Sequence, residues 1–178
     1  MLLVNPWNAM PSGYSVTLKK LRNNYYVDER IYPELQQMFD DARAQGIYPL
    51  IVSAYRTNDY QNGLYQDKIN SYIRQGYSKT EAIRLADGWV ARPGYSEYQT
   101  GLAVDINAER GTGRSVYDWL EQNSYKYGFI VRYPADKVGI TGINYEPWHV
   151  RYVGKEAAKY MYDHDLVLEE YLEILDAQ

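Results

Sequence analysis

The chain has 178 residues, which suits one compact domain with a full-sized core better than two small domains. Its formal net charge of −4 argues against nucleic acid as a partner, because phosphate binding needs a basic face. No apolar run approaches the roughly 20 residues needed to cross a bilayer, and the first residues show no signal peptide. The absence of cysteine removes disulfides, thiolate metal sites and cysteine nucleophiles.

The first half of the chain predicts short strands and three helices. Residues 1–28 are rich in turn residues and predict an irregular or short-stranded segment that packs on the domain. Apolar positions three and four residues apart predict a helix over 29–45, and the apolar run 48–55 predicts a buried strand. A second amphipathic helix is predicted over 58–74, and a capping box at 78–81 opens a third that ends near residue 87.

The second half combines short strands with further helices. Strands are predicted over 102–106, 129–132 and 148–153, and helices over 116–128, 154–162 and 168–175. The pattern lacks the regular alternation of strand and helix that builds a parallel sheet. We therefore expect an α+β fold, in which a small antiparallel sheet is flanked by helices, forming a single domain over residues 1–178.

The first segment that can carry chemistry is Ser53-Ala54-Tyr55-Arg56, at the end of a predicted strand and the start of a helix. An arginine here can hold a carboxylate through two hydrogen bonds, while the helix start offers free backbone N–H groups. The alternative is an ion pair between Arg56 and a structural Asp or Glu. This segment alone leaves both interpretations open.

A second segment runs from a turn-rich loop into the strand predicted over 102–106. Alternation along the strand places Asp105 on the face opposite Leu102, Val104 and Ile106. A carboxylate within an apolar strand is costly unless it is paired or bound to a cation. The alternative is a buried Asp105 that is satisfied by serine or backbone donors.

The third segment contains Glu146 at a turn and His149 on a strand, where His149 and Arg151 share one face. A histidine, an aspartate and a nearby unligated glutamate are the components of a catalytic zinc site. A lone histidine on a strand is more often a hydrogen-bonded core residue. Glu146 shifts the balance toward a site only modestly.

Together, in this order and spacing, the three segments resemble the VanY-type D-alanyl-D-alanine carboxypeptidases. These belong to a group of zinc peptidases that includes lysostaphin-like and hedgehog-type domains. The resemblance rests on Ser53-x-Tyr-Arg56, Ser96-Glu-x-x-x-Gly-x-Ala-x-Asp105 and Glu146-x-Trp-His149, and it covers almost the whole chain. It implies a hedgehog/D-Ala-D-Ala-peptidase-like fold, one Zn2+ ion, and removal of the terminal D-Ala from peptidoglycan stem peptides.

The resemblance also implies roles for individual residues. Asp105 and His149 would be the second and third zinc ligands, and Glu146 would be the general base that activates the zinc-bound water. Arg56 would bind the terminal carboxylate of the substrate or stabilise the oxyanion. The implied substrate-binding residues of the peptide groove are Ser53, Tyr55, Gln61, Ser96 and Trp148.

Tyr98 is the position at which the sequence departs from the family, which has a histidine there as its first zinc ligand. The pKa of a free phenol is about 10, so a metal can bind Tyr98 at neutral pH only by displacing a proton. Glu97, in a segment expected to be extended, should point to the opposite side. His164, the other histidine of the chain, is expected to be a surface residue. We therefore expect weakened zinc affinity.

Three interpretations of Tyr98 stay open. It is an inactivating change, natural or engineered, in an otherwise normal enzyme; it marks a pseudoenzyme that binds stem peptides without cutting them; or it is tolerated in a weaker metal shell. The leading hypothesis is a zinc-dependent D,D- or L,D-carboxypeptidase that Tyr98 impairs. The alternative is a catalytically inactive muropeptide-binding relative. A purely structural domain is less favoured, because Arg56 and Glu146 then have no reason to stand in these motifs.

The resemblance extends to the setting in which the protein acts. We expect it to work outside the cytoplasmic membrane, in the cell envelope or secreted, and as a monomer. The expected partner is a peptidoglycan stem peptide that ends in D-Ala.

Overall fold

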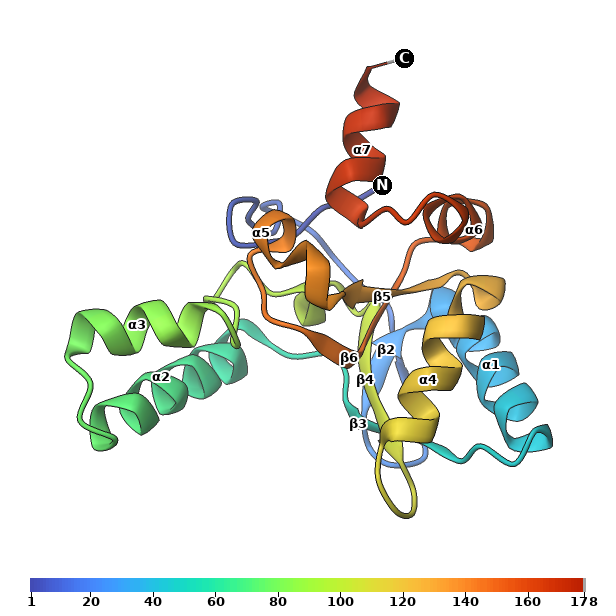
Figure 1. Ribbon diagram of the computed structural model, residues 1–178, viewed down its shortest axis with the longest axis horizontal. Helices are drawn as coiled ribbons and strands as arrows, with labels where there is room; N and C mark the ends of the chain where they lie inside the picture. The colour runs from blue at the N-terminus through green and yellow to red at the C-terminus, as the bar shows by residue number, and fades with distance from the viewer. Residues whose placement is uncertain (178) are drawn as a thin grey trace.

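A four-stranded antiparallel sheet forms the centre of the computed structural model, which describes residues 1–177 (Figure 1). The strands are arranged in the order β3 (Pro49–Ser53), β4 (Ala103–Ala108), β6 (Glu146–Tyr152) and β5 (Phe129–Tyr133). A separate small sheet pairs β1 (Leu18–Lys20) with β2 (Tyr26–Asp28). Helices flank these sheets, and the expected α+β fold class is confirmed.

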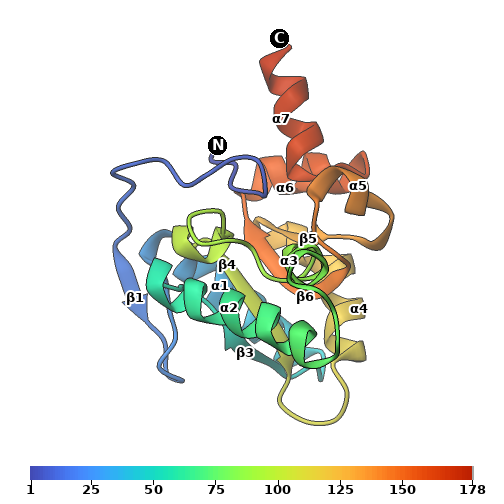
Figure 2. The ribbon, with the colours of Figure 1, turned by 90° about the vertical axis from the view of Figure 1, so that its left-hand side faces the viewer.

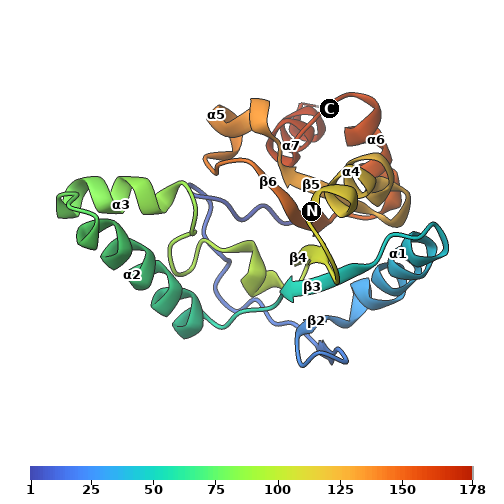
Figure 3. The ribbon, with the colours of Figure 1, turned by 60° about the horizontal axis from the view of Figure 1, so that its bottom comes forward.

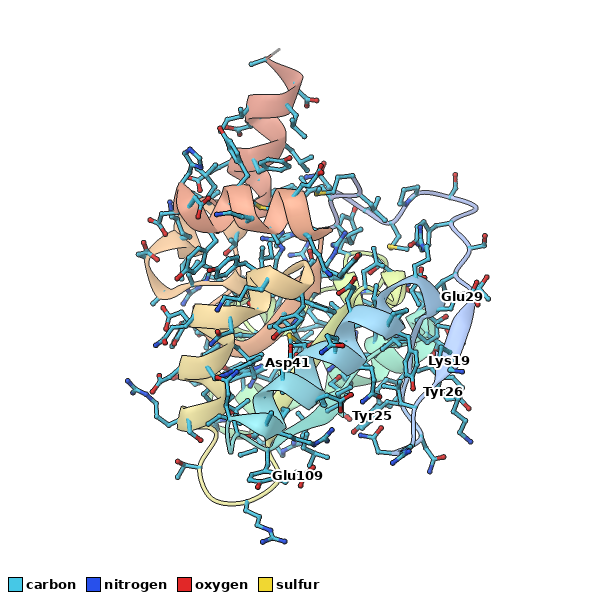
Figure 4. All side chains as sticks on the ribbon, turned by 90° about the vertical axis from the view of Figure 1, so that its right-hand side faces the viewer. Lys19, Tyr25, Tyr26, Glu29, Asp41 and Glu109 are labelled. Carbon is cyan, nitrogen blue, oxygen red and sulfur yellow. The ribbon has the colours of Figure 1, made fainter. Side chains whose placement is uncertain are left out.

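Helices α1 (Tyr32–Ala44) and α4 (Arg114–Asn123) cover one side of the central sheet (Figure 1). The apolar positions of α1 recur at intervals of three and four, and they pack with apolar residues of α4 and the sheet in the main core. The helix predicted over 116–128 ends earlier, because residues 124–127 form a 3₁₀ turn. On this side the Tyr127 hydroxyl donates to Asp41 over 2.7 Å. Asp41 lies on α1, as Figure 4 shows.

Helices α2 (Asn58–Arg74) and α3 (Lys79–Asp87) form an arm that projects on the other side of the sheet from α1 and α4 (Figures 1, 2 and 3). Thr57 caps the start of α2, and the predicted capping box between Ser78 and Glu81 opens α3. The arm has its own small apolar core, made of Tyr65, Ile69, Ala82 and Ala86.

Three helices follow in the last third of the chain: α5 (Val138–Thr141), which the sequence did not predict, α6 (Lys155–Asp163) and α7 (Leu168–Asp176). Helix α7 rises from one end of the molecule, and the N-terminal segment lies beside its base (Figures 1 and 2). None of the described helices is long and apolar enough to cross a membrane.

Candidate active site

The pairing of β4 with β6 places Asp105 directly opposite His149. Opposed residues of an antiparallel pair project from the same face of the sheet, so two distant motifs meet at one point. Asp105 Oδ1 lies 3.2 Å from His149 Nδ1. Both side chains are buried.

Tyr98 completes this cluster from a 3₁₀ turn (Glu97–Thr100) that leads into β4. Its hydroxyl donates to Asp105 Oδ1 over 2.6 Å and lies 2.9 Å from His149 Nδ1. Its ring meets the imidazole edge-on, with the ring centres 4.9 Å apart. The phenol oxygen therefore lies in contact with both residues that the family resemblance implies as metal ligands.

Both ring nitrogens of His149 contact polar groups that affect its protonation. His149 Nδ1 lies 2.9 Å from the phenol oxygen of Tyr98 and 3.2 Å from Asp105 Oδ1. At the other end of the ring, Nε2 lies 3.2 Å from Glu97 Oε2, which can only accept. Burial alone would lower the pKa of His149, but the hydrogen bonds to Asp105 and Glu97 outweigh it and raise the pKa to about 9. These contacts favour the protonated form of the ring.

Glu97 was expected to point away from Tyr98, and this expectation is wrong. The segment is a 3₁₀ turn rather than extended chain, so Glu97 and Tyr98 reach opposite ends of the same imidazole ring. Glu97 Oε1 also accepts from Arg132 over 2.8 Å and from Arg151 over 2.9 Å. Burial would raise the pKa of Glu97, but these two guanidinium groups hold it well below its usual range.

Glu146 stands at the start of β6, and its Oε2 lies 3.9 Å from His149 Nδ1. Burial raises the pKa of Glu146 to about 7; the His149 charge opposes the rise and the Asp105 charge supports it. The carboxyl group can therefore hold or release a proton near neutral pH, as a general acid or base must.

Arg56 lies between β3 and α2, with its guanidinium carbon 3.8 Å from the centre of the Tyr98 ring. Its Nη2 donates to Ser53 Oγ over 2.8 Å, and its Nη1 donates to Gln61 Oε1 over 3.0 Å. Within residues 1–177 it makes no ion pair with Asp or Glu, which removes the structural alternative weighed for it. Gln61 is anchored in turn by its own bond to the Ala91 carbonyl, 2.7 Å long.

Ser96 is 1% exposed, and its hydroxyl has no hydrogen-bond partner in the described part of the chain. A buried unpartnered hydroxyl is costly and requires an explanation. Ser96 lines the same cavity as Arg56, where a ligand with an acceptor oxygen would supply the missing bond.

The cavity that joins these residues has a volume of about 410 Å³ and lies between the arm and the sheet. Of the residues predicted from the sequence, those that line it are Arg56, Gln61, Ser96, Tyr98, Asp105, Glu146, Trp148 and His149. Ser53 and Tyr55 are not among the lining residues: Ser53 holds Arg56, and the backbone N–H of Tyr55 bonds to the carbonyl of Tyr26. His164 is exposed and stacks on Tyr160, as expected for a surface residue.

Sequence reasoning missed Arg132 and Glu169, which lie behind Glu97. Arg132 is fully buried on β5, and it binds both Glu97 and Glu169. The available signal was an arginine within the apolar strand 129–132, because a buried charge requires a charged partner.

The donors of this cluster fit a zinc ion incompletely. Among residues 1–177, no group of three or more His, Cys, Asp or Glu side chains is arranged to hold a metal ion. Asp105 and His149 converge, but the third position holds the neutral phenol of Tyr98. A metal that binds a protonated His149 must first displace a ring proton.

The α+β architecture presents this Asp–His pair beside a buried glutamate and a cavity lined by Arg56, which are components of a metallopeptidase-like site. The chain belongs to the VanY D-alanyl-D-alanine carboxypeptidase family, whose family model matches residues 24–155.

Similar proteins agree with this assignment. A D-alanyl-D-alanine carboxypeptidase of Enterococcus faecalis is 51% identical over 174 residues, which are 97% of this chain and 65% of that protein. The chain thus spans somewhat less than two thirds of that relative's length. The solved structure of VanYB in complex with D-Alanine-D-Alanine matches with a TM-score of 0.95 and 51% identity over 97% of this chain and 96% of that one. A mutant of the vancomycin resistance D,D-pentapeptidase VanY in complex with Zn(II) matches with a TM-score of 0.94 and 51% identity. The match covers 96% of this chain and 97% of that one.

Proposed function

We propose that this protein is a zinc-dependent carboxypeptidase of the VanY type that trims peptidoglycan stem peptides ending in D-Ala, and that Tyr98 impairs its turnover. The observation that carries the proposal is a single cavity lined by Arg56, Ser96, Glu146 and the Asp105–His149 pair. The relatives whose structures hold D-Alanine-D-Alanine and Zn(II) support this substrate and this ion. Because stem peptides belong to the cell wall, we propose that the protein works outside the cytoplasmic membrane. We also propose that it acts as a monomer.

Arg56 and Ser96 supply the donors that a terminal carboxylate needs. The Arg56 guanidinium is fixed by Ser53 and Gln61 and keeps further N–H groups for a ligand, while Ser96 offers its unpartnered hydroxyl. Charge-assisted bonds of this kind recognise carboxylates with strength and directionality. A peptide bound in this way places its last amide bond in the same cavity as Glu146, which is able to exchange a proton with it.

The position of the Tyr98 hydroxyl supports the proposal that turnover is impaired. For Asp105 and His149 to bind zinc, the phenol must lose its proton or turn away, and a protonated His149 must release a ring proton. Each of these changes competes with metal binding. We therefore propose zinc affinity well below that of a site with two histidines and one aspartate.

A second candidate function is a muropeptide-binding protein that does not hydrolyse its ligand. One observation favours it: the hydrogen bonds among Tyr98, Asp105 and His149 satisfy all three polar groups without a metal. Arg56 and Ser96 would bind the same peptide in this case, so the two functions differ in turnover rather than in ligand.

The test compares the chain with Tyr98→His, and with Tyr98→Phe as a control that keeps the ring without adding a ligand. Each protein is incubated with zinc, desalted and analysed for metal, and D-Ala release is measured from pentapeptide and tetrapeptide substrates. We expect about one zinc per chain and rapid release only for Tyr98→His. Equal zinc content and equal release in the original chain would show that Tyr98 does not impair it. Peptide binding without release in Tyr98→His would support the binding-only candidate.

A further inference from the structure

A buried chain of charged groups connects His149 with the last helix of the protein. Glu97 Oε2 lies 3.2 Å from His149 Nε2, and Glu97 Oε1 accepts from Arg132 Nε over 2.8 Å. The other two nitrogens of Arg132 bind both carboxylate oxygens of Glu169, in the first turn of α7, over 2.8 and 2.7 Å. The exposed fraction of these linked residues ranges from 0% for Arg132 to 9% for Glu169.

The same network gathers both ends of the protein. Arg151 binds Glu97 Oε1 over 2.9 Å and the Leu2 carbonyl over 2.7 Å. The Asn5 amide donates to Glu169 over 3.0 Å. The N-terminal segment and the base of α7 lie side by side in Figures 1 and 2. Two glutamates and two arginines thus form a charge-balanced cluster directly behind the imidazole.

The geometry restricts the position of Glu97. Two arginines hold one carboxylate oxygen, and the planar, bidentate contact of Arg132 with Glu169 fixes the guanidinium in turn. The second oxygen of Glu97 therefore has one place, opposite His149 Nε2. A histidine whose second nitrogen meets a fixed carboxylate has its ring orientation determined.

We propose that Glu97 is a positioning residue for His149, and that the Arg132–Glu169 pair makes helix α7 part of the scaffold that sets the orientation of the ring. The inference rests on the proposed function only in taking His149 as a zinc ligand. Anchoring of α7 does not require these charges, because Leu168 already packs in an apolar cluster with Ala158 and Met161. Buried ion pairs are seldom better for stability than apolar contacts, which leaves orientation as their role.

The chain has two histidines, so nitrogen-15 labelling of histidine gives two ring systems that NMR can separate. His164 is exposed and serves as an internal reference. The Nε2–H proton of His149 reports its bond to Glu97 directly. We expect Glu97→Gln to move this resonance upfield and to speed its exchange with water, and Glu169→Gln to produce a smaller shift in the same direction.

The matched control is Glu173→Gln, which removes the same charge from an exposed position on the same helix. It should leave the His149 resonance unchanged, and His164 should stay constant in all variants. If Glu169→Gln does not fold, Glu169→Asp retains the charge on a shorter side chain and is compared with Glu173→Asp.

Two outcomes overturn the inference. An unchanged His149 resonance in Glu97→Gln would show that Glu97 does not position the ring. Identical resonances in folded Glu169 and Glu173 variants would show that α7 is not coupled to it. The experiment uses neither zinc nor peptide, so its failure is distinguishable from a failure of the proposed function.

Discussion

The hydroxyl of Tyr98 donates to Asp105 over 2.6 Å and lies 2.9 Å from His149 Nδ1. Burial and the adjacent Asp105 charge raise the pKa of Tyr98 well above its usual value, so the phenol keeps its proton. The hydroxyl thus links Asp105 and His149, the two residues proposed as zinc ligands. The effect of Tyr98 on zinc binding can therefore be measured as the change in protein stability that zinc produces.

We predict that zinc stabilises Tyr98→His and leaves the original chain nearly unchanged. A ligand at a hundred times its Kd stabilises the folded state by about 2.7 kcal/mol, which for a chain of this size raises Tm by roughly 5–10 °C. Calorimetric scans in zinc and in a chelator measure the difference. Tyr98→Phe should behave as the original chain does, because it adds no ligand. A zinc-dependent rise in the original chain that equals that of Tyr98→His would contradict the prediction.

We predict that Arg56→Ala weakens binding of a peptide with a free terminal carboxylate far more than binding of its amide. Hydrogen bonds to a charged group contribute about 1.5–3 kcal/mol, so the carboxylate peptide should lose roughly tenfold to a hundredfold in affinity. Titration calorimetry with the two peptides provides the comparison.

The control for this prediction is Arg74→Ala, which removes an exposed arginine at the end of α2. It changes the net charge equally but lies outside the residues that line the cavity. Equal losses for the acid and the amide in Arg56→Ala would argue against a role in anchoring the carboxylate.

Local patterns were sufficient to predict the regular elements. Helix α2 was predicted over 58–74 and spans Asn58–Arg74, because its apolar spacing is a local feature. The short elements were harder to predict. The 3₁₀ turn at Glu97–Thr100 ends at Gly101 in a left-handed conformation, and its few residues carry no periodic signal.

The site residues that belong to sequence motifs were predictable. Those that packing brings together from distant parts of the chain were not. Asp105 and His149 pair across two strands that the sequence predicted. The roles of these two residues as metal ligands stay predictions. The contact between Arg132 and Glu169 joins elements far apart in the chain, and no local pattern pairs them. Glu97 was misplaced because a strand reverses successive side chains, whereas a 3₁₀ turn rotates them by about a third of a circle.

We predict that Gly101→Ala destabilises the protein by about 2–4 kcal/mol, since a left-handed backbone costs a side chain roughly 1–2 kcal/mol before any clash. Gly101 has φ of +73°, and an added Cβ would lie 2.9 Å from the backbone nitrogen of Asp28. Gly46→Ala is the control, because its φ of +78° is similar and no atom lies within 4 Å of its added Cβ. Urea unfolding should show the larger loss for Gly101→Ala; equal losses would mean that the close approach to Asp28 does not matter.

Asp28 is buried, and its carboxylate accepts from Arg30 Nε over 2.9 Å. Burial alone would raise the pKa of Asp28, but the hydrogen bonds and charge of Arg30 outweigh it and lower the pKa below its usual value. A carboxyl group whose pKa is lower in the folded state stabilises the fold at pH values above its unfolded pKa, about 3.9. That contribution is lost as the pH falls through the lower, folded pKa.

We therefore predict that Asp28→Asn costs about 1.5–3 kcal/mol at pH 7, because it removes hydrogen bonds between charged groups. The difference from the original chain should shrink as the pH falls below about 4, because the unfolded original chain then binds a proton at Asp28, and it should be lost below the lower pKa of the folded state. Urea unfolding at pH 7, 4 and 2.5 measures both free energies of unfolding. Glu29→Gln, at the exposed neighbouring position seen in Figure 4, should show no comparable loss at pH 7. A difference for Asp28→Asn that stays constant down to pH 2.5 would mean that the charge of Asp28 contributes nothing to the fold, and that its cost comes from shape alone.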